Sequence, residues 1–233
     1  MIISSHTHTH THTHTHTHTQ PRARIHIYRL VRKSMLMELF NSTGPAKAIA
    51  ILPHIDAFVS DRYSGKLLIF GHHKATLDTL AEHISKRGVD FIRIDGRTPL
   101  AARHKLVKKF QTVPSCRVAI LSIATAGIAL TLTAASTVYF AELFWTPAAL
   151  IQAEDRAHRI GQTSQLNIHY YLCPNSIDNI IWPMVLSKMK LLGELFEGSA
   201  TSMEVENSSI SMSALEALQD SGNDMIEITE TVK

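Results

Sequence analysis

Residues 66–94 read KLLIFGHHKATLDTLAEHISKRGVDFIRI, and the fold class follows from this pattern. The stretch starts with a short, largely apolar run of strand length at residues 66–70. Residues 76–87 then have the apolar spacing of an amphipathic helix, which Gly88 ends. Residues 90–94 return to a short apolar pattern. The order strand, helix, strand predicts two neighbouring strands of a parallel sheet.

The same alternation continues toward the C-terminus. After an Asp95-Gly96 turn, residues 98–111 have a helical pattern in which we expect Thr98 as N-cap residue and Pro99 at the first helical position. Further strands are expected at residues 117–121, 138–141 and 167–172, and further helices at residues 46–60, 147–158 and 176–197. The sequence therefore predicts an α/β fold, a parallel sheet with helices on both faces.

Composition is compatible with one folded domain plus attached segments. The chain has 233 residues, 45% of them hydrophobic, which excludes collagen-like and wholly disordered classes. Its only cysteines, Cys116 and Cys173, cannot build a disulfide framework, so we expect a reducing compartment. The net charge of +3 hides an asymmetry, because seven acids and one base lie in residues 201–233. A basic body with an acidic tail favours a polyanionic partner for the body.

The two ends have different compositions from the middle. Residues 1–44 are expected to be unstructured: a low-complexity His-Thr repeat followed by a basic segment. Alternating histidines are able to ligate zinc, nickel or copper, but the pure dipeptide repeat favours a translated simple-sequence tract. Residues 45–197 are the predicted folded domain. Residues 198–233 are predicted to be a disordered acidic tail with a short helix near residues 213–218.

A membrane span is an alternative for one segment. Between Arg117 and Glu142 there are 24 consecutive uncharged residues, enough to cross a bilayer. Six of them are Ser or Thr, and β-branched residues are frequent. Two buried strands joined by a short helix have the same hydropathy, so we expect no membrane contact.

The segment with the most chemistry is QAEDRAHRIGQ at residues 152–162. If Pro147 opens a helix, Gln152, Arg156 and Arg159 lie on one face, at spacings of four and three. Two guanidinium groups and an amide on one face can bind the oxygens of a phosphate. The alternative is a solvated helix face on which acids and arginines pair.

This segment closely resembles motif VI of the Swi/Snf-type helicase-related ATPases. The resemblance implies that Arg156 and Arg159 are arginine fingers that, with Gln152, reach the triphosphate of ATP. Gly127 and Asp155 are implied to lie at the nucleotide. A DEAD-box RNA helicase has a related motif, but the placement of Gln152 and of Asp155-Arg156 argues against it.

Other segments resemble the same family in its order and spacing. Residues 66–78 resemble motif IV, residues 92–111 the block that follows it, and residues 121–136 motif V, in which only Gly127 remains of a Gly-Gly-x-Gly core. The resemblance spans residues 46–197 and is greatest to the annealing-helicase, fork-remodelling branch. It implies a RecA-like second lobe, of the P-loop-NTPase type, with DNA contacts at His72, Lys74, Gly96, Arg97, Thr98, Ser122 and Thr125.

Two interpretations of His72-His73 are open from the residues alone: the pair lines a path for DNA, or it caps the end of a strand. The phosphate-binding loop of a first lobe, G-x-x-x-x-G-K-[ST], does not occur in the sequence, and Gly65-Lys66 has no such loop before it. We therefore expect ATP and Mg²⁺ only together with a first lobe, no tightly bound cofactor or resident metal, and no ATP hydrolysis by this chain alone.

The implied partners are DNA, as forks or single/double-strand junctions, and proteins at the acidic tail, in the nucleus. The alternative function is a stand-alone, non-catalytic adaptor that binds DNA or protein through one RecA-like lobe.

Overall fold

The computed structural model describes residues 21–125, 131–157, 165–196 and 225–232. Its contacts divide the chain after Met37, and the sheet lies in the second unit, residues 38–233. The elements in chain order are α1 (Pro21–Ala50), α2 (Leu52–Ser60), β1 (Leu67–Gly71), α3 (Lys74–Lys86), β2 (Asp90–Ile94), α4 (Leu100–Thr112), β3 (Cys116–Ser122), the 3₁₀ turn η1 (Ile123–Thr125), β4 (Thr137–Phe140), α5 (Pro147–Ala157), β5 (Leu166–Leu172), α6 (Asp178–Phe196) and β6 (Ile226–Val232).

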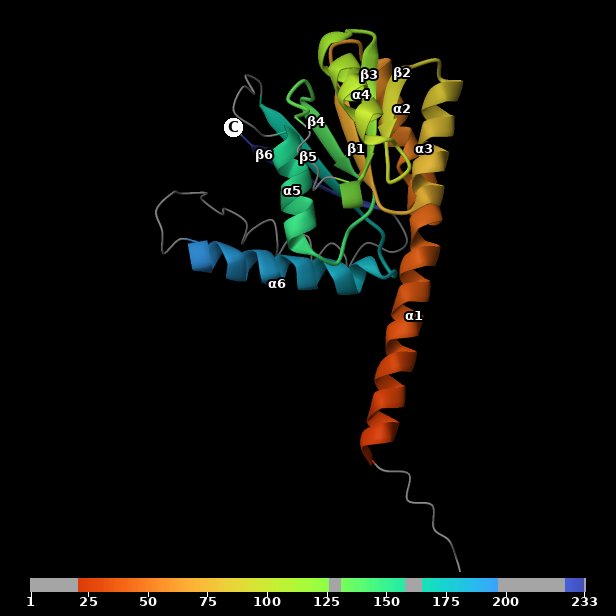
Figure 1. The fold of residues 1–233 in the computed structure, drawn as a ribbon, viewed down its shortest axis with the longest axis vertical. Helices are drawn as coiled ribbons and strands as arrows, with labels where there is room; N and C mark the ends of the chain where they lie inside the picture. Colours follow the sequence, from red (N-terminus) through yellow and green to blue (C-terminus); the bar gives the residue numbers. More distant parts are fainter. Residues whose placement is uncertain (1–20, 126–130, 158–164, 197–224, 233) are drawn as a thin grey trace, which may run out of the picture. The chain divides into compact units, whose positions relative to one another are not determined.

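A six-stranded sheet in the order β2-β3-β1-β4-β5-β6 forms the centre of the second unit (Figure 1). Strands β1 to β5 are parallel, and β6 pairs with β5 in the antiparallel direction. The expected α/β fold is confirmed, and the boundaries of β1 to β5 and of α3 to α6 lie within a few residues of those that the apolar pattern predicts. The helix expected at residues 46–60 is instead the end of α1 followed by α2.

Helices cover the sheet on both faces. Every residue of β1 is buried, so its apolar side chains alternate between the two covered faces. On one face, α2 and α3 contribute Ile55 and Leu80 to a core that also contains Ile69. On the other face, where α4 and α5 lie (Figure 1), the aromatic rings of Phe70, Phe140 and Tyr170 stack in series, and Trp182 of α6 follows.

The long uncharged run at residues 118–141 contains buried strands. It contributes most of β3, the turn η1 and all of β4. In the ranges that the structure describes, no helix is both long and apolar enough to span a bilayer.

Lys66 has a structural role at the N-terminal side of β1. Its Nζ donates to the carbonyl oxygens of Phe110 and of Val113, the latter at 2.7 Å. These carbonyls lie at the C-terminal end of α4, where backbone acceptors have no helical partner. The lysine of the Gly65-Lys66 pair is therefore used to close a helix.

The expectation of an unstructured basic segment before residue 45 is wrong for residues 21–44, which belong to α1. The physical reason is that residues 22–43 contain neither glycine nor proline and many Arg, Leu and Met residues, while Pro21 suits a first helical position. The His-Thr repeat lies outside the described residues.

The expectation of a disordered tail is also wrong for residues 226–232, which form β6. Its residues IEITETV alternate apolar and polar side chains and are rich in β-branched types, a strand pattern. The rest of the tail, including the helix expected near residues 213–218, lies outside the described residues.

Candidate nucleic-acid interface

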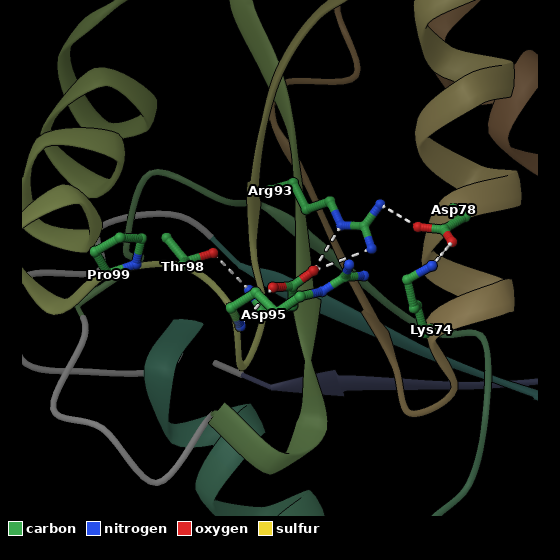
Figure 2. A pocket seen from close by; sticks show the side chains of 7 residues that line it. Lys74, Asp78, Arg93, Asp95, Thr98 and Pro99 are labelled. Carbon is green, nitrogen blue, oxygen red and sulfur yellow. Dashed lines mark hydrogen bonds and ion pairs between the residues drawn. The ribbon is translucent and has the colours of Figure 1, made fainter.

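A charged hollow of about 500 Å³ lies where β2 ends and α3 begins. Figure 2 shows that its side chains come from three elements: the first turns of α3, the end of β2, and the turn between β2 and α4. Three of the DNA-contact residues expected from the sequence are brought together here. The lining residues are Lys74, Asp78, Arg93, Asp95, Arg97, Thr98 and Pro99.

Ion pairs join most of these side chains into one series. Lys74 Nζ lies 3.0 Å from Asp78 Oδ2, and Arg93 Nη1 lies 2.7 Å from Asp78 Oδ1. On its other side, Arg93 Nη2 lies 3.0 Å from Asp95 Oδ2. Arg93 is therefore held between two carboxylates, as Figure 2 shows.

Both carboxylates are stabilised in the ionised form. Hydrogen bonds from Lys74 and Arg93 lower the pKa of Asp78. Burial acts to raise the pKa of Asp95, but the backbone N–H of Arg97 and the charge of Arg93 outweigh it, and the pKa is lowered. Asp78 is thus shared by Lys74 and Arg93, and Asp95 lies beside Arg93. Three cations face two carboxylates, so the hollow keeps positive charge, which Lys74, with 63% of its side chain exposed, and Arg97 present to solvent.

Arg97 is the least compensated cation of the hollow. Its residue is exposed, and within the described parts of the chain its guanidinium group forms no ion pair and no hydrogen bond. Only its backbone N–H is engaged, by Asp95 Oδ1 at 2.9 Å. The Arg97 charge also helps to lower the pKa of Asp95. An exposed guanidinium group on a fixed backbone suits an incoming phosphate oxygen.

The turn before α4 differs from the expected capped helix start. Helix α4 begins at Leu100, and Thr98 is not its N-cap residue. The Thr98 hydroxyl oxygen instead accepts the backbone N–H of Asp95 at 3.0 Å, and the N–H of Thr98 donates to the Asp95 carbonyl at 3.0 Å. Since the N–H groups of Arg97 and Thr98 are both used inside the turn, they are not free for a phosphate.

This turn supports a first prediction. We expect Thr98→Val to lower the free energy of unfolding by about 1 kcal/mol, because the Asp95 N–H loses its acceptor. Urea unfolding measures the change, with Thr112→Val as control, since the Thr112 hydroxyl donates to a helix carbonyl at an exposed site. An equal loss in both variants would contradict this role of Thr98.

The expected nucleotide-facing residues lie on a different element. Gln152, Asp155 and Arg156 belong to α5; the first two are exposed and Arg156 is half-buried. The Arg156 carbonyl accepts the N–H of Leu132 at 2.8 Å, which ties the end of α5 to the segment before β4. Arg159 and Gly127 lie outside the described residues.

Three of the expected DNA-contact side chains are turned inward. Ser122 and Thr125 are only 7% and 5% exposed, and the Thr125 hydroxyl donates to the Ser122 carbonyl at 2.7 Å. The His72 ring packs against Phe40 and Phe144, and its pKa is lowered by burial and by the neighbouring His73. These side chains are used in packing or in a local turn, and their expected DNA contacts stay a prediction.

Sequence reasoning missed Glu142, which organises the turn that precedes Lys74. Its buried carboxylate accepts the N–H groups of His72 and His73 at 2.6 and 2.9 Å, and His73 Nδ1 lies 2.6 Å from its other oxygen. His73 Nε2 lies 3.0 Å from Asn41 Oδ1. The reading of His72-His73 as the cap of a strand end is the one that these contacts support.

Gly44 of α1 is required at this cluster. A Cβ atom at that position would lie 2.4 Å from Glu142 Oε1 and 2.8 Å from His73 Nδ1, so only glycine lets the helix approach the carboxylate. Arg93, Asp78 and Asp95 were also missed as site residues. Their spacing carried a signal, since residues 93 and 95 share one face of a strand and residues 74 and 78 one face of a helix.

The chain matches known proteins over this same region. A family model described as the helicase conserved C-terminal domain matches residues 47–161. The SWI/SNF-related matrix-associated actin-dependent regulator of chromatin subfamily A-like protein 1 of Xenopus tropicalis is 47% identical over 167 residues, which are 71% of this chain and 18% of that protein. The DNA annealing helicase and endonuclease ZRANB3 of Bos taurus is 41% identical over 172 residues, 74% of this chain and 16% of that protein.

Among solved structures, the C-terminal part of the Fun30 ATPase domain has a TM-score of 0.56 and 26% identity over 75% of this chain and 53% of that one. The chain thus spans about a fifth or less of the two curated relatives named above. Its mostly parallel sheet is that of a RecA-like lobe. Residues 47–161 are a helicase C-terminal domain, and the chain belongs to the SWI/SNF-related helicase family that includes the annealing helicases.

Proposed function

We propose that this chain is the C-terminal lobe of an ATP-dependent DNA translocase, an annealing helicase that acts in DNA repair and replication-fork remodelling in the nucleus. The observation that carries the proposal is the charged hollow, in which Lys74 and Arg97 face solvent while Arg93 is compensated by carboxylates. In this role the hollow binds the sugar-phosphate backbone of DNA and reads no base sequence.

The distribution of charge supports a backbone contact. Two exposed cations, Lys74 of α3 and Arg97 of the β2–α4 turn, line the same hollow, so one DNA strand can contact both. The ion pairs of Arg93 with Asp78 and Asp95 tie the two elements together.

The nucleotide contact is proposed for α5. Gln152 and Arg156 lie one turn apart on this helix, and an amide with a guanidinium group suits the oxygens of a triphosphate. ATP with Mg²⁺, when held by a first lobe, would supply the phosphoryl group that is transferred to water. Arg156 would then neutralise the charge of the phosphate, and Gln152 would orient the phosphate. This chain alone would not hydrolyse ATP.

DNA binding at several salt concentrations tests the DNA contact. We expect the double variant Lys74→Ala/Arg97→Ala to bind a labelled duplex or fork roughly ten- to a hundredfold more weakly, with a salt slope lower by about 2. The matched control is Lys86→Ala/Arg87→Ala, which removes the same charge from exposed side chains at the other end of α3. Its affinity should fall far less.

Arg156→Ala distinguishes the two surfaces. Without ATP, this variant should bind DNA as the unchanged chain does, because Arg156 is assigned to the nucleotide. Equal losses in Arg156→Ala and in the Lys74/Arg97 variant would contradict the assignment of roles. DNA affinity that responds to none of these substitutions would favour the alternative of a non-catalytic adaptor.

A further inference from the structure

The last described segment completes the sheet at its β5 edge. Strand β6 pairs with β5 along its whole length, from Leu166 opposite Val232 to Leu172 opposite Ile226. It is the antiparallel strand of a sheet whose other described strands are parallel, and it reaches β5 from far along the chain, after α6 and residues 197–225. Such an edge strand is the geometry by which extended peptides add to a sheet.

On one side of β6, a carboxylate is held between two imidazole rings. Glu227 Oε2 lies 3.0 Å from His54 Nδ1 of α2, and Glu227 Oε1 lies 2.5 Å from His169 Nδ1 of β5. Thr229 Oγ1 lies 3.0 Å from the same His169 nitrogen. A side chain with two oxygen acceptors fits between these rings, so this position selects an acidic residue.

The segment also makes apolar contacts, and its Thr231 hydroxyl donates to Asn167 Oδ1 at 3.2 Å. Ile228 is 8% exposed, and Met225 packs against the core formed by α2, α3 and the sheet. The β5 edge thus recognises an extended segment in which a glutamate, here Glu227, is followed by a buried β-branched residue, here Ile228. Backbone pairing supplies affinity, and the two alternating faces supply selectivity.

We infer that the β5 edge, together with His54 and His169, is a docking site for an extended acidic–apolar peptide, and that residues 225–232 of this chain are its ligand in cis. The site is independent of the charged hollow and of the proposed DNA contact. Because β6 belongs to the same chain, its effective concentration at the β5 edge is on the order of millimolar. A free peptide of the same pattern therefore binds well only when β6 is weakened.

The docking contacts also indicate that β6 can leave the edge. The side chains of His54 and Glu227 are 38% and 30% exposed, and among the described side chains of the segment Ile228 is the buried anchor. One buried anchor and partly exposed polar contacts stabilise the strand only modestly.

Peptide binding to full-length chains tests the inference. A fluorescent peptide with the sequence of residues 224–233, DMIEITETVK, is titrated with the unchanged chain and with Ile228→Asp, and its anisotropy is followed. We expect the variant to bind the peptide at least about tenfold more tightly, because its own strand no longer fills the edge. Adding His54→Ala and His169→Ala to that variant should weaken peptide binding again by about tenfold.

The controls make either result decisive. A peptide with glutamine in place of Glu227 should bind about tenfold more weakly than the original, and a scrambled peptide should not bind. Full-length Glu227→Gln, a milder change, replaces Ile228→Asp if circular dichroism shows that the latter is unfolded. Equal peptide affinity for the unchanged and weakened chains, or equal binding of the scrambled peptide, overturns the inference.

Discussion

Replacing Lys47 by alanine should lower the free energy of unfolding by about 3–5 kcal/mol. Lys47 Nζ lies 2.6 Å from Asp178 Oδ2, and their side chains are only 2% and 3% exposed. Without the lysine, the Asp178 carboxylate remains buried and keeps its hydrogen bond from the N–H of Cys173. A buried charge left uncompensated costs much more than an exposed pair contributes.

Urea unfolding at neutral pH measures this effect. The control is Lys86→Ala, which breaks the ion pair of Lys86 with Glu82, two side chains that are 71% and 67% exposed. The unfolding midpoint of this control should hardly change. The double variant Lys47→Met/Asp178→Leu should recover part of the loss, since it removes both charges together but leaves the Cys173 N–H without its acceptor. A loss as small as that of Lys86→Ala would contradict the burial of the pair.

Replacing Glu142 by alanine should have a similar effect, a loss of about 3–5 kcal/mol, because two backbone N–H groups and the His73 ring lose one buried acceptor. DNA affinity should fall as well, since the turn that Glu142 holds leads directly into Lys74. The control is Glu82→Ala, an exposed glutamate of the same chain, whose unfolding and DNA binding should stay unchanged.

The loss at Glu142 should depend on pH with a defined sign. Burial acts to raise its pKa, but the hydrogen bonds from His73 and the two N–H groups lower it below the usual 4.5. A carboxyl group whose pKa is lowered by folding stabilises the folded state fully at pH values above its pKa in the unfolded chain. This contribution is lost as the pH falls through the lowered pKa of the folded chain. The difference between Glu142→Ala and the unchanged chain should therefore shrink below about pH 4. A constant difference would contradict an ionised Glu142.

Local pattern was sufficient for most of the fold. The apolar run of β1, the amphipathic α3 and the apolar β3 depend on neighbours in sequence, so their spacing predicts them. The parallel direction of β1, β2 and β3 then follows, because a helix separates each of these strands from the next. The same local logic fails at the two ends. The basic composition of residues 21–44 predicts disorder where α1 forms, and β6 is not predicted because one short alternating strand needs a partner edge before it is stable.

The charged hollow was predicted only in part. Lys74, Arg97 and Thr98 were expected from their motifs, and the fold brings them together. Sequence alone did not reveal that Asp78 and Asp95 compensate the charge of Arg93, or that N–H groups of the turn donate to Asp95. The contact of Arg93 with Asp78 depends on where α3 packs beside β2, whereas the contacts of Asp95 are local and depend on the conformation of the turn.

By itself, then, the sequence of this protein determined an α/β lobe with strands and helices in a particular order, and the helix face that carries Gln152 and Arg156. Only the tertiary structure decided which polar groups meet: Glu142 with the His72-His73 turn, Lys47 with Asp178, and Glu227 with His54 and His169. The physical reason is separation along the chain. Periodicity reports contacts within a turn or a strand, whereas these partners lie 58 residues or more apart and meet only when the sheet assembles.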